Sequence, residues 1–315
     1  MNWFPAAILS VLGWGTADLF YKIGSDEEDR YSHLRIAVWV GLIMGVSALA
    51  LLPFSESGLS FSALVKNAVR YSPASLCYII SMVIGYAGLR YLELSIVSPV
   101  QNASGALSAI CMLVYFMAVG RIRAFSEEFS VLDIIGTVLV TLGFIALAVV
   151  EQKLSKEETD RRYRFGALAL LFPLLYCVFD TIGTAADGII LDAETGLGLG
   201  EIDVIILYGL TFFAAGLIIW IFLWVKEKKP YQPFRKSEMP KMPAALCEEF
   251  GQIFYVFAMA ENPVLAAPMV ASYCIVSMIL SRLFIHEKLK LPQYLCIVLV
   301  IAGIILLGIS EGLSA

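Results

Sequence analysis

The sequence contains little charge and almost no histidine. Charged residues make up 16% of its 315 residues, and His33 and His286 are the two histidines. Both lie near the ends of apolar stretches, so a histidine-based metal or catalytic centre is not expected. Hydrophobic residues make up 59% and the mean hydropathy is +0.82, whereas soluble domains contain roughly 45–50% apolar and 25% charged residues. A soluble globule could not hide this much apolar surface from water.

Other signals of chemistry are also absent. No GxxxxGK[ST] segment suggests ATP use, and the six cysteines show no close pair and no metal-ligand spacing. We therefore expect no cofactor, no metal and no catalytic residue. The net charge of −5 gives no reason to expect nucleic-acid binding. No lysine or arginine precedes the first apolar stretch, which favours a retained membrane helix over a signal peptide.

What the chain does contain is a series of apolar stretches, each about the 20 residues that a helix needs to cross a bilayer. The expected spans are 3–22, 34–53, 73–90, 95–118, 131–150, 165–186, 203–225, 243–260, 264–285 and 292–310. The connections between them are polar and mostly short, so no separate soluble domain fits. The sequence therefore predicts an all-α integral membrane protein with ten transmembrane helices.

The chain also repeats itself. Residues 138–147 read VLVTLGFIAL and residues 298–307 read VLVIAGIILL. Weaker matches in the same order are Pro5 and Thr16 with Pro173 and Thr184, GTAD (15–18) with GTAAD (183–187), and Leu76, Cys77 and Pro99 with Leu246, Cys247 and Pro268. We predict a five-helix repeat at 1–150, a loop at 151–164 and a second repeat at 165–315. Because five is odd, the second repeat is inverted, as in many secondary transporters.

The distribution of lysine and arginine predicts the orientation. When each cation is assigned to its nearest connection, eighteen belong to the odd-numbered connections and four to the even-numbered ones. Cytoplasmic loops are enriched in these residues. We therefore expect a multi-pass protein of the cell (inner or plasma) membrane with both termini outside.

Three segments carry a resemblance to a known family: GWGTADLFYKIG at 13–24, LELSIVSPVQNASGALSAI at 92–110, and the whole of 262–307. In these, the chain resembles the drug/metabolite transporter superfamily, in particular its ten-helix EamA-type members. The resemblance implies a transporter fold and identifies no solute. The sequence departs from the family in two ways. The first half lacks a counterpart of Glu287-Lys288-Leu289, and the family's termini are commonly described as cytoplasmic.

Four acidic residues lie deep within predicted helices: Asp18, Asp180, Glu248 and Glu249. A charge at mid-membrane costs about 2.5–3.5 kcal/mol on insertion scales, so such a residue normally faces a cavity or a partner. One interpretation is a cavity that binds an amine or cation, or that takes up protons. The alternative is local neutralisation, since Asp18 and Lys22 are four residues apart on a helix. Glu248 and Glu249 are about 100° apart around a helix and cannot both face the same way.

Two amides follow a proline in the fourth helix. Gln101 and Asn102 come after Pro99, whose ring leaves a backbone carbonyl without its helical partner. This pattern suggests a polar patch for a solute, and a hydrogen bond between helices is the alternative. Pro268 and Ser272 would form the matching patch in the ninth helix.

Several aromatic residues lie within helices, away from the membrane interfaces: Trp14, Tyr78, Tyr86, Tyr176, Tyr255 and Tyr273. In a cavity, a tyrosine offers a ring face to a cation and a hydroxyl to a hydrogen bond. The alternative for each of them is simple packing in the helix bundle.

We therefore predict a gradient-driven secondary transporter of a small metabolite, working by alternating access. An amino acid, an amine or a drug-like cation is the expected solute, and export the expected direction. The predicted substrate-binding residues are Trp14, Asp18, Tyr78, Gln101, Asn102, Tyr176, Asp180, Glu248, Glu249 and Tyr273. The expected partners are a small-molecule solute, protons and the lipid bilayer, and a homodimer stays open. Two alternatives are a non-transporting sensor or assembly protein and an intramembrane enzyme.

Overall fold

The computed structural model describes residues 1–26, 29–55, 61–88, 94–124, 129–158, 171–286 and 289–314. These residues form helices joined by short connections, and no strand occurs among them. The first half contains α1 (Trp3–Gly24), α2 (Ser32–Leu51), α3 (Phe61–Gly88), α4 (Leu94–Ala118) and α6 (Val131–Glu158). The second half contains α7 (Leu171–Leu191), α8 (Glu201–Glu227), α9 (Met242–Glu261), α10 (Pro263–Ala271), α11 (Tyr273–Leu280) and α12 (Leu291–Ser314).

Eight helical stretches are long and apolar enough to cross a membrane, so the prediction of a multi-pass membrane protein is confirmed. The other two predicted spans correspond to α6 and α9. In α6 the apolar part found in the described chain, Val131–Leu147, is shorter. In α9 the polar side chains Glu248, Glu249 and Gln252 interrupt the apolar sequence, and all three are buried inside the protein.

Two predicted helix boundaries are wrong. We expected the third helix to span residues 73–90. Instead α3 begins at Phe61 and contains Pro73 in its interior. The added turns carry Lys66 and Arg70, which are exposed. The fifth helix, α6, continues to Glu158 beyond the predicted end at 150, so that part of the predicted loop is helical.

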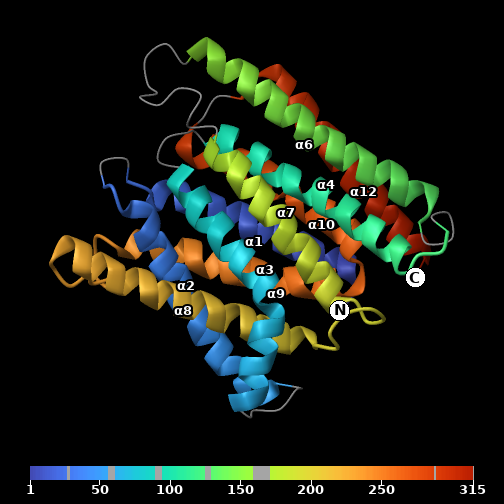
Figure 1. Ribbon diagram of the computed structural model, residues 1–315. Coiled ribbons are helices and arrows are strands. Elements are labelled where there is room, and N and C mark those ends of the chain that lie inside the picture. The colour runs from blue at the N-terminus through green and yellow to red at the C-terminus, as the bar shows by residue number, and fades with distance from the viewer. Residues whose placement is uncertain are drawn as a thin grey trace.

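The helices pack in antiparallel pairs from opposite halves of the chain. Figure 1 shows α2 beside α8 at one edge of the bundle and α6 beside α12 at the other, and both pairs are in extensive contact. Between these edges, α1 packs on α9 and α3 packs on α7, while α4 contacts α7 and α10. The core of the bundle therefore consists of α1, α3, α4, α7, α9, α10 and α11.

Both edge pairs cross at glycine. A Cβ added to Gly41 of α2 would lie 2.9 Å from the Cα of Gly216 in α8. A Cβ added to Gly136 of α6 would lie 3.0 Å from the carbonyl oxygen of Gly303 in α12. Helices in a membrane associate by such close backbone approach, because apolar burial gives no advantage over lipid. These glycines therefore hold the edge pairs together.

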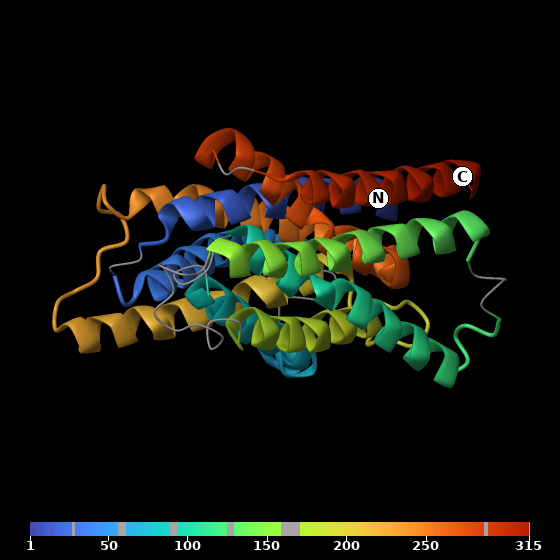
Figure 2. The same cartoon turned by 90° about the horizontal axis from the view of Figure 1, so that it is seen from above.

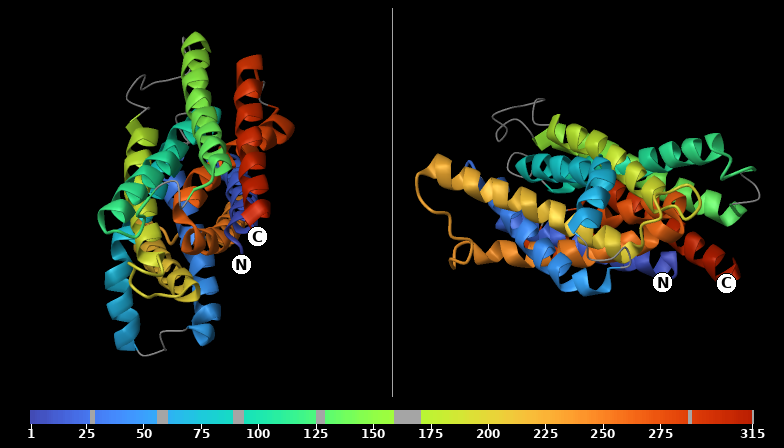
Figure 3. Two further views of the ribbon diagram at one scale, coloured as in Figure 1. Left: turned by 90° about the vertical axis from the view of Figure 1, so that its right-hand side faces the viewer. Right: turned by 60° about the horizontal axis from the view of Figure 1, so that its bottom comes forward.

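The two termini lie at the same end of the bundle, as Figures 2 and 3 show. We call this end the terminal end; Ser55, Gly120, Asp192 and Asn262 also lie there. We call the other the basic end; it carries the connections with most of the lysine and arginine, including residues 228–241. This arrangement follows from the alternating direction of successive helices.

A network of ion pairs ties the basic end together. Arg35 of α2 lies 2.9 Å from Asp29, 2.7 Å from Glu227 and 3.0 Å from Glu238. Glu238 also pairs with Lys241 at 3.0 Å. Burial alone would raise the pKa of Glu238, but the hydrogen bond and charge of Lys241, with further help from Arg35, lower it overall. The ionised form of Glu238 therefore stabilises this end.

Candidate functional site

The ninth span is broken in the middle of the bundle. The helix stops at Ala271, Ser272 forms a turn, and α11 starts at Tyr273. The ring of Pro268 removes a backbone donor just before the break, and the hydroxyl of Ser272 donates to the carbonyl of Met269 at 2.6 Å. Such discontinuous helices occur at the binding sites of secondary transporters.

A cavity of about 60 Å³ lies against this break, between the two halves of the chain. Nine of the ten predicted site residues line it: Trp14, Asp18, Tyr78, Gln101, Asn102, Tyr176, Asp180, Glu248 and Tyr273. The walls also include Tyr21, Met82, Gly85, Tyr86, Ser104, Gly105, Thr184, Tyr208, Tyr255, Ala267, Val270 and Ala271. Residues far apart in the sequence therefore meet in one place.

Three carboxyl groups line the cavity, and each accepts a hydrogen bond from another helix. Ser277 donates to Asp18 at 2.7 Å, Ser104 donates to Asp180 at 2.6 Å, and Tyr21 donates to Glu248 at 3.0 Å. No lysine, arginine or histidine is among the lining residues that the structure describes. The cavity is therefore acidic.

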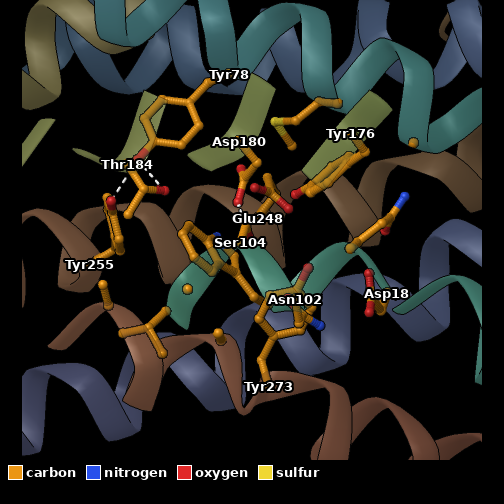
Figure 4. Close-up of a pocket in the computed structure, with 18 of the residues that line it drawn as sticks. Asp18, Tyr78, Asn102, Ser104, Tyr176, Asp180, Thr184, Glu248, Tyr255 and Tyr273 are labelled. Carbon is orange, nitrogen blue, oxygen red and sulfur yellow. Dashed lines mark hydrogen bonds between the residues drawn. The ribbon is translucent and has the colours of Figure 1, made fainter. Parts of the chain in front are cut away.

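Figure 4 shows how the carboxyl groups are arranged. Asp180 and Glu248 point into the middle of the cavity beside Tyr176, and Asp18 lies to one side of them near Asn102. Tyr78, Thr184 and Tyr255 lie on the opposite side. The cavity therefore has an acidic middle and one end made of hydroxyl groups.

Eight aromatic side chains form most of the remaining wall: Trp14, Tyr21, Tyr78, Tyr86, Tyr176, Tyr208, Tyr255 and Tyr273. The ring of Trp14 lies 4.9 Å from that of Tyr255 and 5.8 Å from that of Tyr273, measured between centroids. Ring faces attract cations within about 6 Å of their centroids. Aromatic walls and carboxyl groups thus favour the same kind of ligand.

The structure brings both predicted amides to the cavity. Gln101 and Asn102 are buried and line the cavity. The Nε2 atom of Gln101 is buried without a hydrogen-bond partner in the described structure, so it is available to a ligand. The predicted matching patch is wrong, because neither Pro268 nor Ser272 lines the cavity. The hydroxyl of Ser272 bonds to its own helix instead.

Glu248 and Glu249 separate, as their spacing predicts. Glu248 is 6% exposed and lines the cavity. Glu249 is 8% exposed but faces α2, where Ser47 is its hydrogen-bonding partner. The structure therefore does not bring Glu249 to the cavity, because consecutive residues point about 100° apart on a helix.

Sequence reasoning missed several wall residues. Tyr21 follows Asp18 by three residues and so lies on the same helix face, a signal that was present in the sequence. Thr184 belongs to the GTAAD segment, which we interpreted only as part of the repeat and not as part of a binding site. Tyr208 gave no signal, since the whole of α8 is apolar and its cavity face is set by packing against α3.

Comparison with known proteins gives a match to a protein family over part of the chain. Residues 194–309 match the model of the EamA-like transporter family. The predicted resemblance to EamA-type transporters is thereby confirmed over this part of the chain. The EamA-like region runs from the segment before α8 into α12, and it supplies Tyr208, Glu248, Tyr255 and Tyr273 to the cavity.

A protein of known crystal structure has the same overall fold. It aligns over 99% of this chain and 99% of its own, with a TM-score of 0.62 and 12% sequence identity. At that identity the likeness concerns the fold alone. No curated protein matches the sequence. The apolar helices indicate a multi-pass membrane protein, and residues 194–309 of it are similar to the EamA-like transporter family.

Proposed function

We propose that the protein is a secondary transporter that moves a compact amine or other organic cation through the central cavity by alternating access. One observation carries this proposal. The cavity contains three carboxyl groups and eight aromatic rings, and no cationic side chain lines its described walls. Carboxyl groups and ring faces both attract positive charge. An anionic solute would meet repulsion from every ionised carboxyl group.

The helix pairing supports a ten-helix inverted repeat. In the order of the chain, α1, α2, α3, α4 and α6 would correspond to α7, α8, α9, α10 with α11, and α12. The contact of α1 with α9 then corresponds to that of α7 with α3, and α4 with α7 corresponds to α10 and α11 with α1. The pairs α2 with α8 and α6 with α12 correspond to themselves. A two-fold relation between the halves predicts this pattern of contacts.

Alternating access follows from such a repeat, since rocking one half against the other opens the central site to each side in turn. A cation bound to Asp180 and Glu248 would replace the protons that these groups hold when the cavity is empty. Amine and proton would therefore compete for the same carboxyl groups, which couples solute movement to a proton gradient. With the basic end in the cytoplasm, by the distribution of lysine and arginine, this exchange would export the amine.

Ligand-dependent thermal unfolding of the purified protein tests the solute class. The panel contains quaternary amines such as tetraethylammonium, polyamines, amino acids, nucleosides and sugar phosphates, each at two pH values. A ligand at a hundred times its dissociation constant adds about 2.7 kcal/mol to the native state. We expect stabilisation by amines that weakens at low pH, where the carboxyl groups are protonated.

Two variants on one helix provide the control. Glu248→Gln removes a cavity carboxyl group, and Glu261→Gln removes an exposed one at the end of α9. We expect Glu248→Gln to lose amine binding and uptake into proteoliposomes while Glu261→Gln keeps both. Stabilisation by sugar phosphates instead of amines would contradict the proposal. Amine binding without flux would favour a non-transporting sensor.

A further inference from the structure

A fourth buried acid lies just outside the cavity. Asp187 of α7 is 0% exposed and is not among the residues that line the cavity. It follows Asp180 by seven residues, so it lies on nearly the same face of α7 about 10 Å further towards the terminal end. Tyr71 of α3 donates to its Oδ1 atom at 2.9 Å. Its Oδ2 atom is buried without a hydrogen-bond partner in the described structure.

A layer of hydroxyl groups separates Asp187 from the cavity. We call Tyr78, Thr184 and Tyr255 the hydroxyl layer; all three line the cavity end seen in Figure 4. Tyr78 donates to Thr184 at 3.2 Å, and its hydroxyl is also hydrogen-bonded to that of Tyr255. Tyr255 of this layer is also a side-chain hydrogen-bonding partner of Asp187, so Asp187 lies close behind the layer. A chain of hydroxyl groups therefore links Asp187 to the cavity.

Tight packing closes the other side of Asp187. A Cβ added to the next residue, Gly188, would collide with Met112 of α4 and would lie 2.8 Å from Pro263 and 3.1 Å from Met259. Pro263 begins α10 at the terminal end. The terminal end is therefore closed beyond Asp187 in this conformation.

In the described part of the chain, the titratable neighbours of Asp187 are Tyr71 and Tyr78 from α3, Tyr208 from α8, Tyr255 from α9 and Asp180 from its own helix, and none of these carries a positive charge. The side chains nearest to the adjacent Gly188 are Met112 of α4, Met259 of α9 and Pro263 of α10, and all three are apolar. An isolated buried carboxylate is costly, so the neutral, protonated carboxyl group is the favoured form while the site is sealed.

Asp187 has a counterpart in the first half of the chain. Asp18 ends GTAD and Asp187 ends GTAAD. Asp18 lies near the basic end of α1 and is partly exposed to the cavity, whereas Asp187 lies near the terminal end of α7 and is sealed. In an inverted repeat, the two counterparts exchange their surroundings when the protein alternates between its two open forms. Opening of the terminal end would therefore expose Asp187.

We propose that Asp187 is a proton-binding site separate from the solute-binding carboxyl groups; this inference rests on the proposed function. The carboxylate takes a proton from water when the terminal end is open and is sealed in the neutral form when that end closes. When an amine enters from the basic end, its charge favours ionisation of Asp187. The O–H bond then breaks, and the proton passes through the hydroxyl layer to water in the cavity.

The test compares two transport modes in proteoliposomes with labelled tetraethylammonium as the probe. Equilibrium exchange across the membrane needs a solute site but no net proton movement. Accumulation driven by a pH gradient needs a solute site and also net proton movement. We expect Asp187→Asn to keep exchange and to reduce gradient-driven accumulation, because competition of amine and proton at Asp180 and Glu248 still provides part of the coupling. Glu194→Gln, an exposed acid at the same end, is the matched control and should behave as the wild type does in both modes.

Several outcomes would overturn the inference. Normal gradient-driven accumulation by Asp187→Asn would remove the proton role, and loss of exchange in this folded variant would make Asp187 part of the solute site. Accumulation driven by a sodium gradient alone would replace the proton with sodium. If Asp187→Asn does not fold, Tyr71→Phe removes the hydroxyl that bonds to Oδ1 and should slow accumulation while exchange continues. A wild type that neither binds nor moves tetraethylammonium or any other amine would overturn the proposed function as well.

Discussion

The terminal end and the basic end of the bundle are closed by different chemistry. At the terminal end, Gly188 packs against apolar side chains of α4, α9 and α10 beside the sealed acid Asp187, and the pairs of Arg121 with Asp192 and Glu194 lie closer to the surface. At the basic end, Arg35 and Lys241 join acids from several segments, and the cavity acid nearest to that end, Asp18, is partly exposed. Under the proposed alternating access, this difference means that Asp18 and Asp187 meet water in different conformations.

The largest effect should come from disturbing the apolar closure. Gly188→Ala places a methyl group against Met112, Pro263 and Met259. Overpacking of this kind costs about 1–3 kcal/mol, and the cost falls only on the conformation in which the terminal end is closed. We expect the population to shift roughly tenfold to a hundredfold towards the terminal-open form.

The rate of thiol labelling measures this shift. A cysteine at position 184 (Thr184→Cys, with the six natural cysteines replaced) reports access to the cavity from the terminal side. We expect Gly188→Ala to accelerate its reaction with a membrane-impermeant reagent applied there. Gly312→Ala, whose added Cβ would meet nothing within 4 Å, is the control. Equal labelling rates in both variants would show that apolar packing does not hold this end closed.

A smaller effect is expected from the ionic closure at the basic end. Glu238→Gln removes charge-assisted bonds to Arg35 and Lys241 and should lower the free energy of unfolding by about 2 kcal/mol. Because its pKa is lowered in the folded state, the contribution of Glu238 is present above the pKa of the unfolded chain and is lost as pH falls through the lower folded value.

Thermal unfolding at two pH values tests the direction of this pH dependence. The difference in unfolding temperature between wild type and Glu238→Gln should be large at pH 6 and should shrink towards pH 4 and below, near the ordinary pKa of glutamate of about 4.3. Lys236 is an exposed residue of the same segment. Lys236→Gln should leave the unfolding temperature unchanged at both pH values. A difference that grows on acidification would show that the network does not depend on ionised Glu238.

The smallest effect should come from removing the serine hydroxyl groups that donate hydrogen bonds to two of the cavity acids. Ser277→Ala and Ser104→Ala each remove one hydrogen bond, to Asp18 and to Asp180. We expect each to weaken amine binding by about tenfold, or about 1.4 kcal/mol. Similar losses, measured by calorimetry, would mean that both halves bind the solute. A loss in Ser104→Ala alone would leave Asp18 with a structural role only.

Much of the fold could be predicted from the sequence, because the apolar runs that cross a bilayer are local. The ten expected spans correspond to helices, and the short connection at Asn262 and Pro263 is present. The start of α3 was missed because the turns before residue 73 carry Lys66 and Arg70 and lie outside the apolar stretch, although they are helical. The connection at 89–93, the pair Glu287-Lys288 and the loop residues 159–170 lie outside the described residues.

The sequence by itself indicated most of the acids that enter the middle of the bundle, but not Asp187, which lies just beyond the predicted end of the sixth span at 186. A carboxyl group in an apolar helix has to face a cavity or a partner, and this rule indicated Asp18, Asp180 and Glu248 before any contact was known. Only the tertiary structure decided that these three share one cavity, that Glu249 faces α2 instead, and that Asp187 is sealed behind the hydroxyl layer. The reason is physical. The cost of burying a charge is a property of one helix, whereas the choice between cavity, partner and sealed pocket depends on which helices pack against it.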